Sequence, residues 1–252
     1  YNVAEDCSRQ MNPTDYPSGW QRVAAGIWPW KCKDSVFQYN ECYNNQYAYH
    51  GNGDGQAWDA DWTDGTLYQY NYSHGNSRGA IMFCGAEAVN TTFRYNISEN
   101  ELTGPLDLPG NPDAHIYNNT FYMNENIKSI FDRTGGNAVL ENNIFYYGGS
   151  TPLNQNWYPG GTLQYDNNLY YNFANTPSGD KNAVVVNAGT KVLEDAGSGP
   201  SSNTSGIAYI KENASVFDGY KLAEDSPAIN AGKVITDNNG YDLEHDFFGH
   251  AL

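Results

Sequence analysis

The sequence is short of positive charge. Of its 252 residues, 13 are Lys or Arg and 29 are Asp or Glu, so the formal net charge is -16. A nucleic-acid-binding protein needs a basic stripe to neutralise phosphates, and an anionic membrane surface attracts basic segments in the same way. We therefore expect no nucleic acid partner and no binding to anionic membrane surfaces.

Long apolar runs and several common signatures are also missing. No run approaches the roughly 20 apolar residues that cross a bilayer, so we expect no transmembrane segment. The sequence has no His-Glu-X-X-His pair, no phosphate-binding loop and no cysteine pair at zinc spacing. No metal site is therefore predicted from motifs, and no cofactor is expected to be needed for the chemistry.

Cysteine is scarce, and the chain shows no N-terminal leader. The four cysteines fall in the first third of the chain, and their even number allows one or two disulfides or four free thiols, which both stay open. They are Cys7, Cys32, Cys42 and Cys84. Because the chain begins at Tyr1, we expect a processed protein or a segment of a longer one.

What the sequence does contain is a repeat. An apolar or aromatic residue, two variable residues and Asn recur with intervals from Asn to Asn of 31, 25, 23, 24 and 25 residues. The repeated asparagines are Asn40, Asn71, Asn96, Asn119, Asn143 and Asn168. This interval is typical of one coil of a parallel β-helix, and helix periodicity is nearly absent. The fold class predicted is all-β, a right-handed parallel β-helix of about 23–31 residues per coil.

The repeated asparagines predict a ladder of side-chain amides inside the coils. At each corner the chain turns sharply, and Asn tolerates the left-handed backbone conformation better than other non-glycine residues. Stacked amides can also hydrogen-bond from one coil to the next. We therefore expect each repeated Asn to occupy a corner in the left-handed conformation.

The repeat also suggests how the chain is organised. We expect one domain over residues 1–252, with regular coils over about 20–175 and an irregular C-terminal capping region over about 176–252. Nothing comparable to a cap precedes the first coil, although a solenoid needs its end coils covered. N-terminal coils of a longer parent chain, or a second chain of the same protein, are therefore expected partners.

Acidic residues and tryptophans gather in one segment. Asp54, Trp58, Asp59, Asp61 and Trp62 lie within nine residues. Trp28 and Trp30 come one coil earlier, and His74 and Arg78 follow on the next turns. If residues 57–61 form a strand, Asp59 and Asp61 point to the same side, because side chains alternate along a strand.

Paired carboxylates are the groups that cleave glycosides. One protonated acid donates to the leaving oxygen, and the second attacks the anomeric carbon or activates water. Tryptophan faces stack on sugar rings, so an oligosaccharide or polysaccharide is the expected substrate. The alternative is that the aspartates form turns or a structural Ca²⁺ site, which acid-rich turns often do.

The residues that carry this pattern resemble a known class of proteins. The segments Gly26-Ile-Trp-Pro-Trp, Asp54-Gly-Gln-Ala-Trp-Asp-Ala-Asp and Tyr70-Asn-Tyr-Ser-His are similar to those of secreted bacterial parallel β-helix proteins of the pectate-lyase-like superfamily. Within it, Asp54 and Asp61 resemble the catalytic pair of glycoside hydrolase family 136, the lacto-N-biosidases. The resemblance implies an extracellular retaining hydrolase with Asp54 as general acid/base and Asp61 as nucleophile.

The resemblance also implies which residues hold the sugar, and it leaves two other functions open. The substrate-binding residues it implies are Asp59, Trp58, Trp62, His74, Trp28, Trp30 and Arg78. One alternative is a Ca²⁺-dependent polysaccharide lyase or other uronate-acting enzyme, which normally wants more Lys or Arg near the acids. The other is a non-catalytic carbohydrate-binding or adhesive solenoid.

Overall fold

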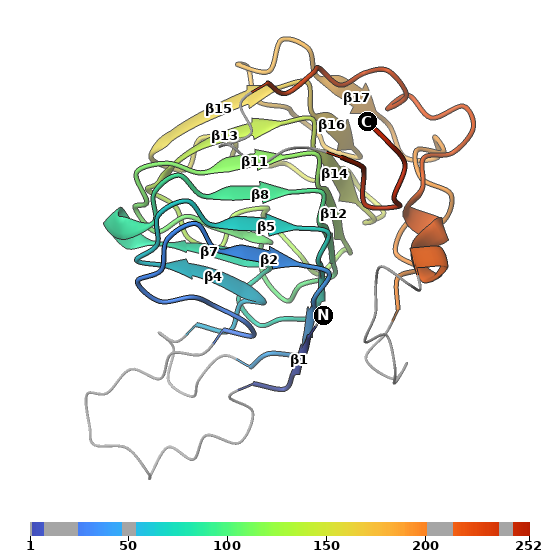
Figure 1. The fold of residues 1–252 in the computed structure, drawn as a ribbon. Helices are drawn as coiled ribbons and strands as arrows, with labels where there is room; N and C mark the ends of the chain where they lie inside the picture. The colour runs from blue at the N-terminus through green and yellow to red at the C-terminus, as the bar shows by residue number, and fades with distance from the viewer. Residues whose placement is uncertain (1, 8–24, 47–53, 201–213, 237–243) are drawn as a thin grey trace.

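The structure is a computed structural model that describes residues 2–7, 25–46, 54–200, 214–236 and 244–252. Almost all of its regular structure consists of short parallel strands stacked in successive coils (Figure 1). The predicted parallel β-helix is confirmed. None of the helical segments in these ranges has the length and hydropathy of a membrane span.

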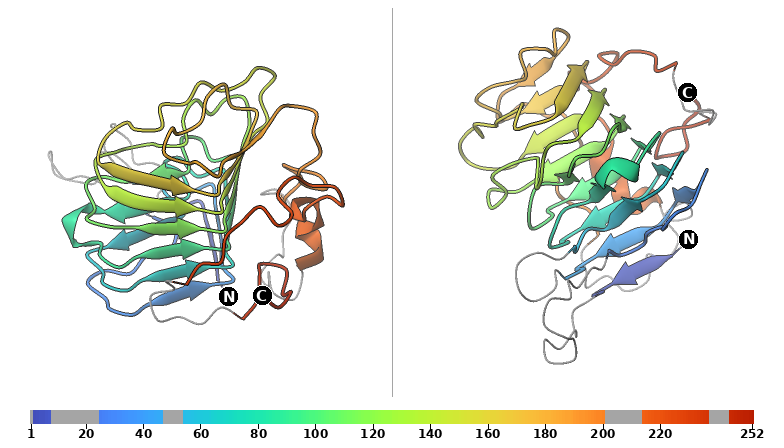
Figure 2. Two further views of the ribbon diagram at one scale, coloured as in Figure 1. Left: turned by 90° about the horizontal axis from the view of Figure 1, so that it is seen from above. Right: turned by 90° about the vertical axis from the view of Figure 1, so that its left-hand side faces the viewer.

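The strands form three sheets that run along the stack of coils, as the two views of Figure 2 show. The eight-stranded sheet contains β1 (Val3–Glu5), β3 (Glu41–Tyr43), β6 (Tyr72–His74), β9 (Ile97–Glu99), β12 (Thr120–Met123), β14 (Ile144–Tyr147), β16 (Leu169–Tyr171) and β17 (Val184–Val186). The six-stranded sheet contains β2 (Val36–Gln38), β5 (Leu67–Gln69), β8 (Thr92–Arg94), β11 (His115–Tyr117), β13 (Asn137–Glu141) and β15 (Thr162–Asp166). The three-stranded sheet contains β4 (Trp58–Asp61), β7 (Ile81–Cys84) and β10 (Leu106–Asp107). Two short 3-10 helices, η2 (Gly85–Glu87) and η3 (Ala214–Tyr220), complete the assigned elements.

The strand register reproduces the spacing of the repeat. In the six-stranded sheet Val36 pairs with Leu67, 31 residues on, and Leu67 pairs with Thr92, 25 residues on. Thr92 pairs with His115 and His115 with Val139, which are steps of 23 and 24 residues. These are the intervals between the repeated asparagines, so each repeat is one coil.

Aromatic side chains fill the interior of the coils. One column begins with Phe37, Tyr68 and Phe93, which are register partners, and the rings of Phe37 and Tyr68 stack with centroids 5.0 Å apart. A second column stacks Phe121 on Phe145 at 5.4 Å. Each large ring buried in this way contributes on the order of 2 kcal/mol or more through burial. The columns fix the register, because a slip by one residue would turn every ring outward.

The asparagine ladder forms as predicted. Each amide Nδ2 donates to the Oδ1 of the next coil, at 3.1 Å from Asn40 to Asn71 and 3.0 Å from Asn71 to Asn96. The ladder ends on a carboxylate, because Asn168 donates to Asp180 Oδ2 at 2.9 Å. Since these amides are buried, each rung satisfies a donor and an acceptor that would otherwise be costly to bury.

The prediction that these asparagines adopt the left-handed conformation is wrong. The residue before each of them does so, with positive φ values between 50° and 57°. These residues are Tyr39, Tyr70, Tyr95, Asn118, Asn142 and Asn167. The ladder asparagine follows the turn because its amide must point into the coil, where the next rung lies.

A shorter ladder runs beside the eight-stranded sheet. Asn45 donates to Asn76 Oδ1 at 2.8 Å, and Asn76 donates to Glu101 Oε2 at 2.9 Å. Glu101 is buried, and burial raises its pKa to about 7, although the hydrogen bonds from Asn76 oppose the shift. A carboxyl group therefore takes a place in this ladder that an amide could also fill.

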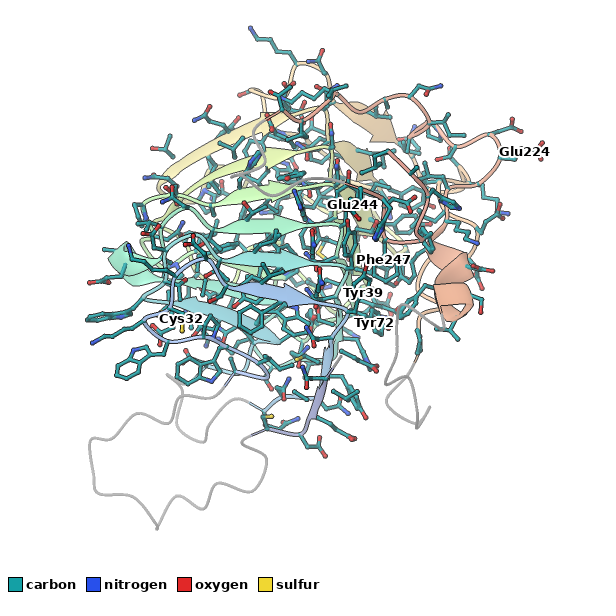
Figure 3. The ribbon with its side chains drawn as sticks, viewed as in Figure 1. Cys32, Tyr39, Tyr72, Glu224, Glu244 and Phe247 are labelled. Atoms are coloured by element: carbon teal, nitrogen blue, oxygen red, sulfur yellow. The ribbon has the colours of Figure 1, made fainter. Side chains whose placement is uncertain are left out.

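The C-terminal region is irregular, as predicted, and lies along the side of the stack (Figure 2). It contacts late coils where Asn167 donates to the Ala231 carbonyl and the Lys233 backbone donates to Asn142. It contacts the first coils where Tyr70 donates to the His245 carbonyl at 2.8 Å. Figure 3 shows Tyr39, Tyr72 and Phe247 on this side, and all three belong to one apolar cluster. The predicted start of the regular coils near residue 20 lies outside the described residues.

Candidate active site

The acidic segment forms strand β4 of the three-stranded sheet. Trp58 and Ala60 point into the core and are fully buried, so Asp59 and Asp61 point outward. A carboxylate oxygen of Asp59 and one of Asp61 lie within 4.8 Å of each other. The prediction that the two aspartates share one side is confirmed. Inside the coil, Tyr68 donates its hydroxyl to the Asp59 carbonyl at 2.6 Å and holds β4 in place.

Neighbouring strands add further side chains to the same outer face. Asp59 pairs with Met82 of β7, which pairs with Asp107 of β10. In the adjacent row Asp61 pairs with Cys84. Because strands in a sheet are about 4.8 Å apart, these outward side chains form a compact surface.

Arg133 ties this surface to Asp54. Its Nε donates to the two carboxylate oxygens of Asp107 at 2.9 and 3.0 Å, and its Nη2 lies 3.6 Å from Asp54 Oδ1. Gln56 also donates to Asp107, at 2.6 Å. Asp107 is fully buried, and these donors supply the partners that a buried carboxylate requires. We call Asp54, Asp59, Asp61, Asp107 and Arg133 the acidic site.

The carboxyl groups of the acidic site have perturbed acidities. Burial raises the pKa of Asp59 well above its usual range, and the charges of Asp61 and Asp54 raise it further. Burial also raises the pKa of Asp54, while the Arg133 charge opposes this and the charges of Asp107 and Asp61 add to it. Groups of this kind suit proton transfer near neutral pH.

Three exposed tryptophans lie beside the acidic site. Trp30 is a bridge partner of Asp61 and is 58% exposed, and the same register places Trp28, 40% exposed, alongside Asp59. Trp62 follows β4 directly and is 47% exposed. The Lys31 ammonium lies 4.7 Å from the ring centres of both Trp30 and Trp62. These rings offer apolar faces next to carboxylates, which is the combination that sugar-binding sites use.

Comparison with known proteins agrees with this geometry. No family model matches the chain. A curated lacto-N-biosidase of Bifidobacterium longum subsp. longum is 51% identical over 261 residues, which cover the whole chain and 16% of that protein. The chain is a relative of the lacto-N-biosidases. It spans about one sixth of the length of this relative.

Solved structures of lacto-N-biosidases are similar as well. A selenomethionine crystal structure of the family 136 lacto-N-biosidase from Eubacterium ramulus matches with a TM-score of 0.50 and 44% sequence identity, over 58% of this chain and 23% of that one. The native crystal structure of the same enzyme matches with 37% identity and a TM-score of 0.48, over 64% of this chain and 23% of that one.

Two residues predicted to bind sugar in this lacto-N-biosidase relative lie elsewhere. Trp58 is fully buried in the core, so its ring cannot stack on a sugar, because its place on β4 alternates with Asp59 and Asp61. His74 lies in β6 of the eight-stranded sheet, where it is 3.2 Å from Glu41 and stacks on Tyr43. The structure does not bring His74 to the acidic site, since the coil turns a corner between the two sheets.

Arg78 lies near the acidic site, as predicted, and is paired. Its Nε is 2.7 Å from Asp132 Oδ2, and its charge lowers the pKa of Asp54. The pentapeptide Gly75-Asn-Ser-Arg-Gly79 has the Gly-X-Ser-X-Gly spacing of serine hydrolases. That motif requires a strand-to-helix turn, whereas this segment connects β6 to β7.

Sequence reasoning did not place Asp107, Arg133 and Cys84 in the acidic site. Two of them could have been found from the repeat. The outward row runs Asp59, Met82, Asp107, in steps of 23 and 25 residues, which are intervals of the asparagine ladder. Arg133 gives no such signal, because it reaches Asp107 from a loop outside the named strands.

Proposed function

We propose that the protein is a retaining glycoside hydrolase that releases lacto-N-biose from oligosaccharides. The observation that carries the proposal is the acidic site beside exposed tryptophans in a chain 51% identical to a lacto-N-biosidase. The site is open to a sugar at Trp28, Trp30 and Trp62. We also propose that the protein works outside the cell, as expected from the resemblance.

In the proposed mechanism Asp54 is the general acid and then the general base. Burial favours its protonated form, so it can donate a proton to the glycosidic oxygen as the bond to the leaving group breaks. Arg133, 3.6 Å away, limits this shift and stabilises the carboxylate once the proton has left. The regenerated carboxylate then accepts a proton from the water that completes hydrolysis.

Asp61 is the proposed nucleophile. It points outward from the end of β4, and no Lys or Arg of the described ranges lies within ion-pair distance of it. Its carboxylate attacks the anomeric carbon to give a covalent glycosyl ester, which water cleaves with overall retention. The chemistry needs no metal ion, and a structural Ca²⁺ stays part of the proposal for the full protein.

The test is product analysis with the full-length protein and its Asp54→Asn and Asp61→Asn variants. Wild type should release a saturated disaccharide from lacto-N-tetraose, and each variant should lose roughly 10³-fold or more in rate. Nuclear magnetic resonance of the first product should show the β-anomer. Asp218→Asn is the matched control, because Asp218 is exposed on η3 and pairs with Lys221 there.

The same experiment distinguishes the other functions. Unsaturated uronate products would identify a lyase, although Arg78 and Arg133 are both engaged with carboxylates and are not available as bases. Binding of glycans without cleavage by the intact protein would identify a carbohydrate-binding solenoid. Cleavage that both Asp→Asn variants retain would contradict the assigned roles.

A further inference from the structure

Three side chains that commonly bind metals meet on the outer face of the three-stranded sheet. A carboxylate oxygen of Asp59, a carboxylate oxygen of Asp61 and the Cys84 sulfur all lie within 4.8 Å of one another. Asp61 and Cys84 are register partners on adjacent strands, and their side chains are hydrogen-bonded. Because all three stand on strands of one sheet, the arrangement is held by the fold.

Asp59 supplies an independent observation that points to a ligand. The residue is 4% exposed, and its Oδ1 is buried without a hydrogen-bond partner. A buried carboxylate oxygen without a partner costs free energy, so native structures rarely keep one unless something else binds it. Its neighbours Asp61 and Cys84 offer no donor that reaches this oxygen.

The local charge also favours a cation. Within the part of the chain that the structure describes, no Lys or Arg forms an ion pair with Asp59 or Asp61. The two nearby arginines are paired with other acids, Arg78 with Asp132 and Arg133 with Asp107. The acidic site therefore has an excess of carboxylates over cations on its outer face.

We propose that Asp59, Asp61 and Cys84 form a binding site for a thiol-seeking divalent cation, which Zn²⁺ fits best. Zn²⁺ accepts sulfur and carboxylate oxygen, and three protein ligands leave its fourth position to water. Ca²⁺ fits less well, because it takes six to eight oxygen ligands and has little affinity for a thiol. The ion replaces the Cys84 thiol proton and the Asp59 carboxyl proton, and both protons pass to the solvent.

Such an ion has a consequence for the proposed function. Asp61 is the proposed nucleophile, and a carboxylate that binds Zn²⁺ cannot attack an anomeric carbon. Zn²⁺ therefore inhibits the hydrolase reversibly, and this half of the inference rests on the proposed function. The binding half does not, because it depends only on the three ligands.

Calorimetric titration of the chelator-treated full-length protein with Zn²⁺ tests the binding. Wild type should bind one ion at this site, and Cys84→Ser and Asp59→Asn should each weaken it by at least roughly tenfold, since even outer-shell partners are worth about 10- to 100-fold in metal affinity. Cys32→Ser is the matched control, because Cys32 is an exposed free thiol. Cd²⁺ should produce a thiolate charge-transfer absorbance that Cys84→Ser loses and Cys32→Ser keeps.

Proton release and activity complete the test. Titration in two buffers of different ionisation enthalpy should show that wild type releases more protons than Cys84→Ser on binding Zn²⁺. Zn²⁺ should slow hydrolysis by wild type more than by Cys84→Ser, and a chelator should restore the rate. Equal Zn²⁺ affinity in wild type and in folded Cys84→Ser and Cys84→Ala variants would overturn the site whatever the activity. An inactive wild type that still binds Zn²⁺ through Cys84 would overturn only the proposed function.

Discussion

At the scale of single residues, three outward carboxyl groups differ because their surroundings differ. Asp59 lies between Asp54, Asp61 and Asp107 and is nearly inaccessible to solvent, so its proton is retained to high pH. Asp54 is less buried and has Arg133 at 3.6 Å. Close carboxyl groups cannot all ionise together, and this difference separates acid from nucleophile on one small surface.

Asp59→Asn tests whether Asp59 works in its neutral form. An amide has the shape of a protonated carboxyl group, so the variant should keep the hydrolysis rate within about tenfold, whereas Asp61→Asn should lose far more. Because the pKa of Asp59 is raised on folding, ionisation at higher pH costs wild-type stability, and the variant is spared that cost. Thermal unfolding at pH 5 and pH 8 should show a smaller decrease for Asp59→Asn. A loss of activity as large as that of Asp61→Asn would show that Asp59 acts as a carboxylate.

At the scale of elements, the ladders bind each coil to the next. The six repeated asparagines form one chain of buried amides, and Asn45, Asn76 and Glu101 form a second. Each rung fixes the depth at which a coil stacks on its neighbour, so the outward rows on β4, β7 and β10 come into register. The acidic site therefore depends on hydrogen bonds made on the opposite side of the strands.

Glu101→Gln tests the carboxyl group of the second ladder. The pKa of Glu101 is about 7 when folded and near 4.5 when unfolded, so the folded state holds this proton more tightly. Stability from this group is present below about pH 4.5, decreases as pH rises through the window to about 7, and is then lost. At about 1.4 kcal/mol per pKa unit, the loss is at most roughly 3 kcal/mol. Urea unfolding should show that the variant, which keeps an acceptor for Asn76, loses less stability between pH 5 and pH 8 than wild type. Parallel pH profiles would be evidence that Glu101 is ionised when folded.

At the scale of the whole molecule, the C-terminal region holds early and late coils together. Its residues 231–233 contact the corners at Asn142 and Asn167, and His245 contacts those at Tyr39 and Tyr70. These corner residues have left-handed backbones, which cost free energy for a tyrosine or asparagine. Contacts with the C-terminal region offset that cost along the length of the stack.

Phe247→Ala tests this arrangement. Phe247 is 8% exposed and meets Phe217 edge-on with ring centroids 5.2 Å apart. Removal of a buried phenylalanine ring typically costs about 3–5 kcal/mol, which should appear as a lower urea midpoint. Val234→Ala, at a position 87% exposed in the same region, should change stability by less than about 0.5 kcal/mol. Equal, small effects of the two substitutions would mean that the C-terminal region contributes little to the stack.

Some of this protein is determined by local sequence alone. The interval between repeated asparagines predicts the coil, because one coil of chain must return to the same corner, and strand register then follows those intervals. Alternation along β4 predicts that Asp59 and Asp61 face the same way. The tertiary structure decides the rest. Whether Trp58 faces a sugar or the core depends on which face of β4 is covered, and whether His74 meets the acids depends on where the coil turns. Cys84 and Arg133 join the acidic site only because coils of unequal length stack in one register, and sequence spacing does not give the loop paths that set it.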